Sequence, residues 1–131
     1  MSLGMIAAVL VAGTVGAVLR WATTKLLGTR SDFPRAVLLV NLVGSALAGT
    51  VFGIAVSNSI TYDVYLVLVT GFCGGLTTFS TFSVDTVQLA LAGRIRTAVT
   101  NALTNLLLGI AAAAIPFAIL SAILPPTITL D

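Results

Sequence analysis

The sequence predicts an all-α membrane protein with four transmembrane helices. Of its 131 residues, 58% are hydrophobic and 8% are charged, and the mean hydropathy is +1.15. A soluble globule of this size exposes more polar surface than such a composition supplies. Four apolar runs are each long enough to cross a hydrocarbon core of roughly 30 Å, which takes about 20 helical residues. Because their connections are short, we expect a single domain over residues 1–131.

The four runs follow one another through polar connections. The first covers residues 4–26, and because the opening MSLG lacks the basic residues of a secretory signal, we expect a retained helix. The second covers 36–57, the third 64–92 and the fourth 97–124. Charged residues, proline and glycine stand between them, as is typical of the ends of transmembrane helices.

Three of the runs carry small or polar residues at every fourth position. The rows are Gly4, Ala8, Ala12, Gly16 and Arg20 in the first run, Asn41, Ser45, Gly49, Gly53 and Ser57 in the second, and Thr97, Asn101, Asn105, Gly109 and Ala113 in the fourth. Because an α-helix turns every ~3.6 residues, each row stays near one face and lets neighbouring backbones approach closely. We therefore expect the glycines and alanines to pack the helices together.

Polar side chains inside these runs need partners. A carboxamide in lipid is costly unless it faces protein, water or a polar ligand, so Asn41, Asn101 and Asn105 indicate either interhelical hydrogen bonds or a ligand site. Arg20 lies near the far end of the first run. It can reach the interface beside Lys25 or cap carbonyl groups inside the protein, and the residues alone slightly favour the interface.

The third run contains TGFCGGLTTFSTFS, residues 70–83, which a plain membrane anchor does not need. Gly71, Gly74 and Gly75 favour a broken helix, with the break near residues 74–77. Unpaired backbone at membrane depth is tolerated only where it is buried or lines a polar cavity. The break frees carbonyl groups for a cation, and the start of the resumed helix offers N–H groups to an anion.

Aromatic and hydroxyl side chains follow the break. Phe79 and Phe82 are three residues apart and share a face if the helix resumes there, and their ring edges carry partial positive charge. The neighbouring serines and threonines supply hydroxyl donors. The segment therefore offers an anion several donors without a fixed positive charge, which favours a small, hard anion that binds and then leaves.

The stretch GFCGGLTTFSTFS resembles the signature of the CrcB or Fluc family of fluoride channels. The resemblance continues through GAVLRW around Arg20 and VNLVGS around Asn41, and it covers essentially the whole chain. It implies passive, electrodiffusive export of cytoplasmic fluoride through the bacterial plasma (inner) membrane, which confers fluoride resistance and is not an enzymatic activity. It also implies an antiparallel dual-topology dimer whose two pores are each lined by both protomers.

The resemblance also assigns site residues. Phe79 and Phe82 match the phenylalanines whose ring edges face fluoride, and Asn41 matches the pore asparagine. Gly74 and Thr77 match the positions whose backbone carbonyls bind a central structural sodium ion (Na+) at the dimer interface. The remaining matches are Ser80, Thr81 and Asn105 for a polar track and Arg20 for the aqueous vestibule.

Two features depart from the family pattern. Gly109 stands where some members have a serine, which leaves water or Thr104 to supply a donor on the fourth helix. Apart from Arg20, the lysines and arginines lie in or beside the first and third connections, at Lys25, Arg30, Arg35, Arg94 and Arg96. Positive charge on one side predicts a single orientation with both termini outside, and hence a heterodimer with an oppositely inserted paralogue. The family pattern favours a homodimer, which is the expectation we adopt.

Other functions explain the residues less well. A small proton-coupled multidrug exporter needs an acidic group deep in its pocket, and the first two runs contain no Asp or Glu. A noncatalytic assembly subunit accounts for the glycine rows but not for Phe79, Phe82 and their hydroxyl neighbours. The sequence has no His and only one Cys, so catalytic and metal-binding patterns are missing. Asp85 can face a vestibule, cap a break or pair with a cation such as Arg20, and the pairing is the expectation that we adopt.

Overall fold

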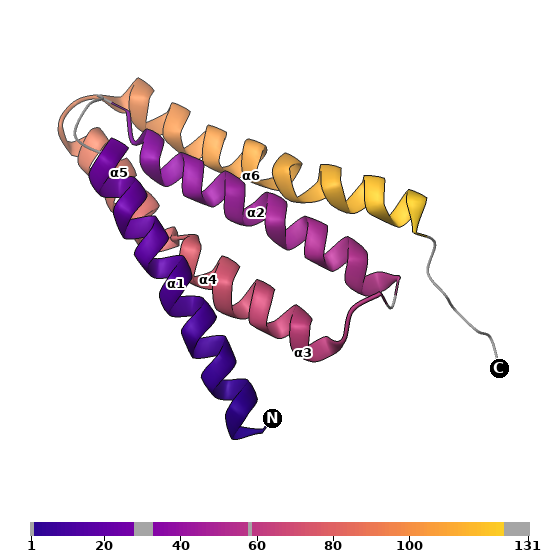
Figure 1. Ribbon diagram of the computed structural model, residues 1–131. Helices are drawn as coiled ribbons and strands as arrows, with labels where there is room; N and C mark the ends of the chain where they lie inside the picture. Colours follow the sequence, from indigo (N-terminus) through magenta and orange to yellow (C-terminus); the bar gives the residue numbers. More distant parts are fainter. Residues whose placement is uncertain (1, 28–32, 58, 125–131) are drawn as a thin grey trace.

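The protein folds as an all-helical bundle with four helices long and apolar enough to cross a membrane (Figure 1). The computed structural model describes residues 2–27, 33–57 and 59–124. Three of the spans are single helices: α1 (Leu3–Leu27), α2 (Arg35–Val56) and α6 (Ile95–Ile123). The third span, Tyr62–Leu91, is built from several shorter segments.

The third span is bent, as the sequence predicts. It contains α3 (Tyr62–Tyr65), the π-helical segment η1 (Leu66–Cys73), α4 (Gly74–Leu76) and α5 (Phe79–Leu91). The helix is interrupted at Thr77 and Thr78, whose backbones are extended with ψ of 157° and 121°. The residues that leave the helix are thus threonines, whereas the three glycines expected to cause the break lie in helical backbone.

Those glycines instead let α1 approach the third span. A Cβ at Gly71 would lie 2.8 Å from the Val9 carbonyl oxygen, and a Cβ at Gly75 would collide with the Gly13 carbonyl. A Cβ at Gly16 would likewise collide with the third-span backbone. Backbone contact at this distance is the small-residue packing expected of membrane helices. Gly13, one residue outside the predicted row, carries part of this contact.

The small-residue rows of α2 and α6 meet each other. Their facing positions are Asn41 with Asn105, Ser45 with Gly109 and Gly49 with Ala113, and beyond them Gly53 lies against Phe117 and Leu120. The members of each pair are separated by the same number of positions, so the two helices run parallel and in register, side by side (Figure 1). A Cβ at Gly49 would collide with the Ala113 carbonyl oxygen.

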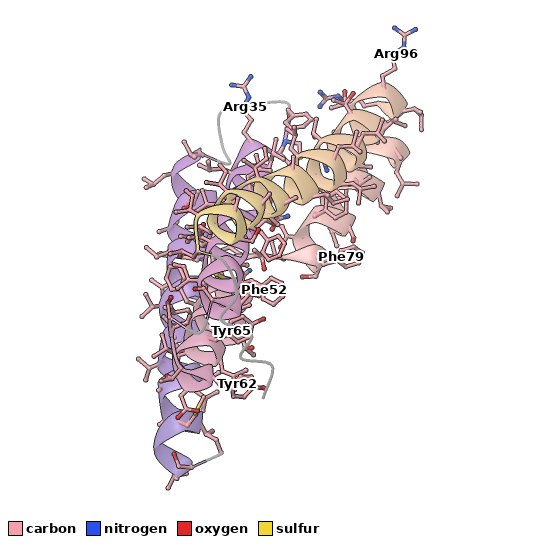
Figure 2. All side chains as sticks on the ribbon, turned by 90° about the vertical axis from the view of Figure 1, so that its right-hand side faces the viewer. Arg35, Phe52, Tyr62, Tyr65, Phe79 and Arg96 are labelled. Atoms are coloured by element: carbon pink, nitrogen blue, oxygen red, sulfur yellow. The ribbon has the colours of Figure 1, made fainter. Side chains whose placement is uncertain are left out.

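The two ends of the bundle carry different side chains. Arg35 at the start of α2 and Arg96 in the first turn of α6 point away from the bundle at one end, and Tyr62 lies toward the other (Figure 2). Lys25, in the last turn of α1, lies 4.9 Å from the centre of the Trp21 ring. A lysine over an indole ring and a row of arginines are typical anchors at the membrane interface.

We expect Gly49→Val to destabilise the α2–α6 pair, because the added side chain has no space against the α6 backbone. Overpacking of this kind costs about 1–3 kcal/mol or more. Thermal unfolding in detergent should show a lower midpoint for Gly49→Val and an unchanged midpoint for Gly4→Val, where the nearest atom to a Cβ is the Ser2 hydroxyl oxygen at 4.0 Å. Equal midpoints for the two variants would contradict the close packing at Gly49.

Candidate functional site

An open cavity of about 500 Å³ lies at the break in the third span. We call it the phenylalanine cavity. Its lining comes from α2, the break, α5 and α6, and consists of Asn41, Ser45, Thr77, Thr78, Phe79, Phe82, Ala102, Asn105 and Leu106. Residues from three parts of the sequence that were predicted as site residues thus meet around one space.

The two phenylalanine rings form one wall of the cavity. Their centroids are 5.8 Å apart and their planes are tilted by 53°, so the rings do not stack face to face and their edges remain available. Phe79 is 80% exposed and projects from the side of the bundle, whereas Phe82 is half-buried (Figure 2). The outer side of this wall is therefore uncovered within the described chain.

The Asn41 side chain holds the broken backbone at Thr78. Its Oδ1 accepts a hydrogen bond from the Thr78 N–H at 2.8 Å, and its Nδ2 donates to the Thr78 carbonyl at 3.2 Å. One carboxamide thus pairs both backbone groups of a residue that has left the helix. Of the two alternatives for Asn41, the interhelical bond is present, and the ligand contact stays a prediction for a side chain that lines the cavity.

A chain of hydrogen bonds continues from Asn41 through α6. Asn41 Nδ2 donates to Asn105 Oδ1 at 3.0 Å, and Asn105 Nδ2 donates to Asn101 Oδ1 at 3.0 Å and to the Asn101 carbonyl at 3.1 Å. Asn101, which is fully buried, donates to Thr86 Oγ1 at 2.8 Å. The Thr86 hydroxyl donates in turn to the Phe82 carbonyl at 2.7 Å.

This chain has a fixed direction. The Thr78 N–H can only donate, so it sets the Asn41 oxygen toward itself, and the Asn41 nitrogen must then face two acceptors. Asn105 is oriented by the same logic and uses its nitrogen on two oxygens of Asn101. As a consequence, Asn41 and Asn105 line the cavity while their amide hydrogens point to protein acceptors.

Arg20 caps a carbonyl at the break. Its Nε donates to the Gly75 carbonyl at 3.1 Å, so the slight preference of the residues alone for an interfacial position was wrong. In a continuous helix Gly75 would accept from the N–H four residues later, and the break removes that donor. Arg20 is not among the residues that line the phenylalanine cavity.

Two further carbonyls at the break lose their helical donors. The N–H groups that would bond Gly74 and Thr77 in a continuous helix are those of Thr78 and Thr81. Thr78 donates to Asn41 Oδ1, and Thr81 donates to Thr78 Oγ1 at 3.2 Å. Gly74 is exposed. The two carbonyls predicted to bind a cation therefore do not receive the N–H hydrogen bonds that a continuous helix would supply.

Hydroxyl groups connect the phenylalanine cavity to a second one. Thr78 Oγ1 lies 3.1 Å from Thr81 Oγ1 and 3.3 Å from Ser80 Oγ. Thr81 also lines an open cavity of about 350 Å³ at the basic end of the bundle, together with Asp85 and Arg94. Asp85 forms no ion pair within residues 2–27, 33–57 and 59–124, so the expected pairing with Arg20 was wrong.

Thr104 does not supply the hydroxyl donor that the fourth helix lacks at Gly109. Thr104, considered as a substitute at the position of Gly109, donates its hydroxyl hydrogen to carbonyls of its own helix and does not line the cavity. Ser45 on α2 does line it, next to Gly109. Its spacing of four residues from Asn41 places both side chains on one helix face, but Ser45 was not among the predicted site residues.

The sequence is similar to those of known proteins. A family described as CrcB-like protein, Camphor Resistance (CrcB), matches residues 7–117. The chain is similar to the fluoride-specific ion channel FluC of Pyrococcus horikoshii, with 40% identity over 84% of this chain and 90% of the relative. It is also similar to the proteins of that name from Klebsiella pneumoniae, with 42% identity over 86% and 91%, and Serratia proteamaculans, with 42% over 79% and 84%.

We expect Asn41→Leu to destabilise the fold, because it leaves the N–H and the C=O of Thr78 without partners. An unsatisfied buried polar group costs about 1–3 kcal/mol. The denaturation midpoint in detergent should fall clearly for Asn41→Leu and stay near wild type for Thr104→Val, which removes only a hydroxyl bonded to its own helix. A wild-type midpoint for Asn41→Leu would show that water replaces the carboxamide.

Proposed function

Because this chain belongs to the CrcB-like family, we propose that it is a fluoride-specific ion channel. The observation that carries this function is the phenylalanine cavity, where a transmembrane helix is broken beside two aromatic edges and a set of hydroxyl groups. The protein is a multi-pass membrane protein, and fluoride is the ion that it conducts. The cavity lining contains no Asp or Glu, the group that a proton-coupled exporter needs.

Conduction follows from weak, directional donors. Ring edges attract an anion, and the N–H groups of the first turn of α5 have no carbonyl of their own helix to bond. Donors of this strength replace part of the hydration shell of fluoride. They bind the ion less tightly than a fixed positive charge would, so that it can leave. Phe79 and Phe82 are the residues that we assign to the fluoride contact. Asn41 and Asn105 are assigned to the wall, and Ser80 and Thr81 to the hydroxyl track toward the second cavity.

The exposed apolar surface of a single chain supports an antiparallel dimer. Phe79 is 80% exposed, and none of the most hydrophobic stretch of α6 is buried within the described chain. A dehydrated anion needs an enclosed path, and a second protomer against the exposed ring would close it. The family resemblance favours a second copy of the same chain inserted in the opposite direction.

The charge distribution bears on the partner. Lys25, Arg35, Arg94 and Arg96 all lie at or beside the ends of helices that meet at one end of the bundle. Such an asymmetry favours one orientation in the membrane. A homodimer requires this chain to insert both ways, so an oppositely oriented paralogue is the alternative partner.

The carbonyls of Gly74 and Thr77 fit the structural sodium ion. Sodium is a hard cation that takes oxygen ligands, and these two carbonyls have lost their helical donors to Asn41 and to the Thr78 hydroxyl. Two protomers would bring four such oxygens together. Bound there, the ion would neutralise carbonyl dipoles at the centre of the dimer.

Fluoride efflux from liposomes that contain the purified protein alone tests the function. A fluoride electrode should record rapid efflux, and a chloride electrode should record none. Efflux from this chain alone also establishes that it forms its own dimer. Efflux that requires an added paralogue would select the heterodimer, and well-folded protein that stays silent with that partner would overturn the channel function.

Phe79→Ile and Phe82→Ile should each abolish efflux while the protein stays folded. Isoleucine keeps most of the bulk but lacks the polarised ring edge. We expect rates at the background leak for both variants, with a wild-type elution profile in gel filtration. Phe52→Ile, at an aromatic cluster away from the cavity, is the matched control and should conduct normally. Wild-type flux in Phe79→Ile and Phe82→Ile would remove the role of the rings.

The purified protein should retain sodium. After equilibration with ²²Na⁺ and gel filtration, we expect about one ion for every two chains, since one central site serves both protomers. Protein unfolded in sodium dodecyl sulfate is the control and should release the label. Complete loss of label from the folded protein, at a concentration where it conducts fluoride, would contradict the proposed site.

A further inference from the structure

The polar side chains that line the phenylalanine cavity differ in whether their hydrogens are free. Asn41 and Asn105 donate their amide hydrogens to protein oxygens. Thr77 donates its hydroxyl hydrogen to a carbonyl one turn earlier, at 3.0 Å, and Thr78 donates to a hydroxyl of α5, at 3.1 Å. All of these donors are therefore occupied. The remaining polar side chain of the lining is Ser45.

Ser45 is placed to keep its hydrogen available. Hydroxyls in helices usually donate to a carbonyl of the preceding turn, as Thr50 of the same helix does to the Ala46 carbonyl at 2.8 Å. Ser45 forms no such bond within the described part of the chain. Its Oγ lies 3.9 Å from the position that a Cβ would take at Gly109, so position 109 of α6 places no side chain beside this hydroxyl.

A free hydroxyl in a membrane-embedded cavity favours a ligand that accepts hydrogen bonds. The cost of leaving a donor unpaired is high in a site of low polarity, and an anion removes it. Neither Asn41 nor Asn105 can serve in this way without releasing a protein acceptor. Ser45 can do so without breaking any bond of the structure.

Resting on the proposed channel function, we propose that the Ser45 hydroxyl is an anion-binding donor of the phenylalanine cavity and acts together with the edges of Phe79 and Phe82. Ser45 supplies, from α2, a hydroxyl group that α6 lacks at Gly109. The bound species is a small anion that accepts a short hydrogen bond, and fluoride is the anion that the channel conducts.

The test is fluoride efflux from liposomes for Ser45→Ala, with the double variant Ser45→Ala/Gly109→Ser. We expect Ser45→Ala to slow efflux by about tenfold or more, the factor expected for one hydrogen bond to a charged group. The fluoride concentration for half-maximal flux should rise as well, which a purely structural change would not produce. Returning a hydroxyl from position 109 should restore part of the rate.

Ser121→Ala is the matched control, because the Ser121 hydroxyl donates to a carbonyl of α6 away from the cavity. It should conduct like wild type. Wild-type flux in Ser45→Ala overturns the role of Ser45 and leaves the channel function intact. A slow Ser45→Ala that the added serine does not improve also overturns it, because the loss then comes from packing. A silent wild type, with or without a paralogue, removes the channel function itself.

Discussion

The pairing of one carboxamide with the backbone of Thr78 is the contact on which the site depends. A membrane helix can be interrupted only where its freed N–H and C=O groups find partners inside the protein. Asn41 provides both partners at Thr78, and Arg20 provides one at Gly75. These two side chains come from different helices, so the break is stable only when α1 and α2 are docked against the third span. The site and the bundle therefore form together.

The same contact also positions the aromatic wall. Hydrogen bonds run from Thr78 through three asparagines to Thr86, and the Thr86 hydroxyl ends the chain at the Phe82 carbonyl. Because every group in this chain donates in one direction, no side-chain flip can occur at one position without disturbing the next. Such oriented networks stiffen a polar core of low dielectric constant. The two rings thus lie between Thr78, which Asn41 of α2 holds, and Thr86, whose side chain Asn101 of α6 contacts.

Much of the fold followed from the sequence, because membrane spans are read from composition and length. The bend was also predictable, but its cause was not. Glycine serves both to interrupt a helix and to let another backbone approach, and only the position of α1 shows that Gly71 and Gly75 do the second. Local sequence does not reveal the π-helical turns of Leu66–Cys73 either.

The site residues were recognisable by type, whereas their hydrogen-bond roles depended on partners distant in the sequence. Arg20 meets Gly75 only because α1 packs along the third span, and a single-residue argument favours the water interface instead. In the sequence Ser45 stands in a row of small and polar residues with Gly49 and Gly53, and those two glycines do pack against α6. The free hydroxyl of Ser45 becomes visible only after the donors around it are traced to their acceptors.

A cavity whose strongest donors are already occupied suits an ion that must leave as readily as it binds. If the amides of Asn41 and Asn105 faced the anion, several hydrogen bonds would hold it, and each would slow its release. Using those amides on protein acceptors leaves ring edges and single hydroxyls for the anion of the proposed channel. Under that proposal, selectivity rests on the rigidity and width of the path. The asparagine side chains, which look most like ligands in the sequence, hold the break and one another.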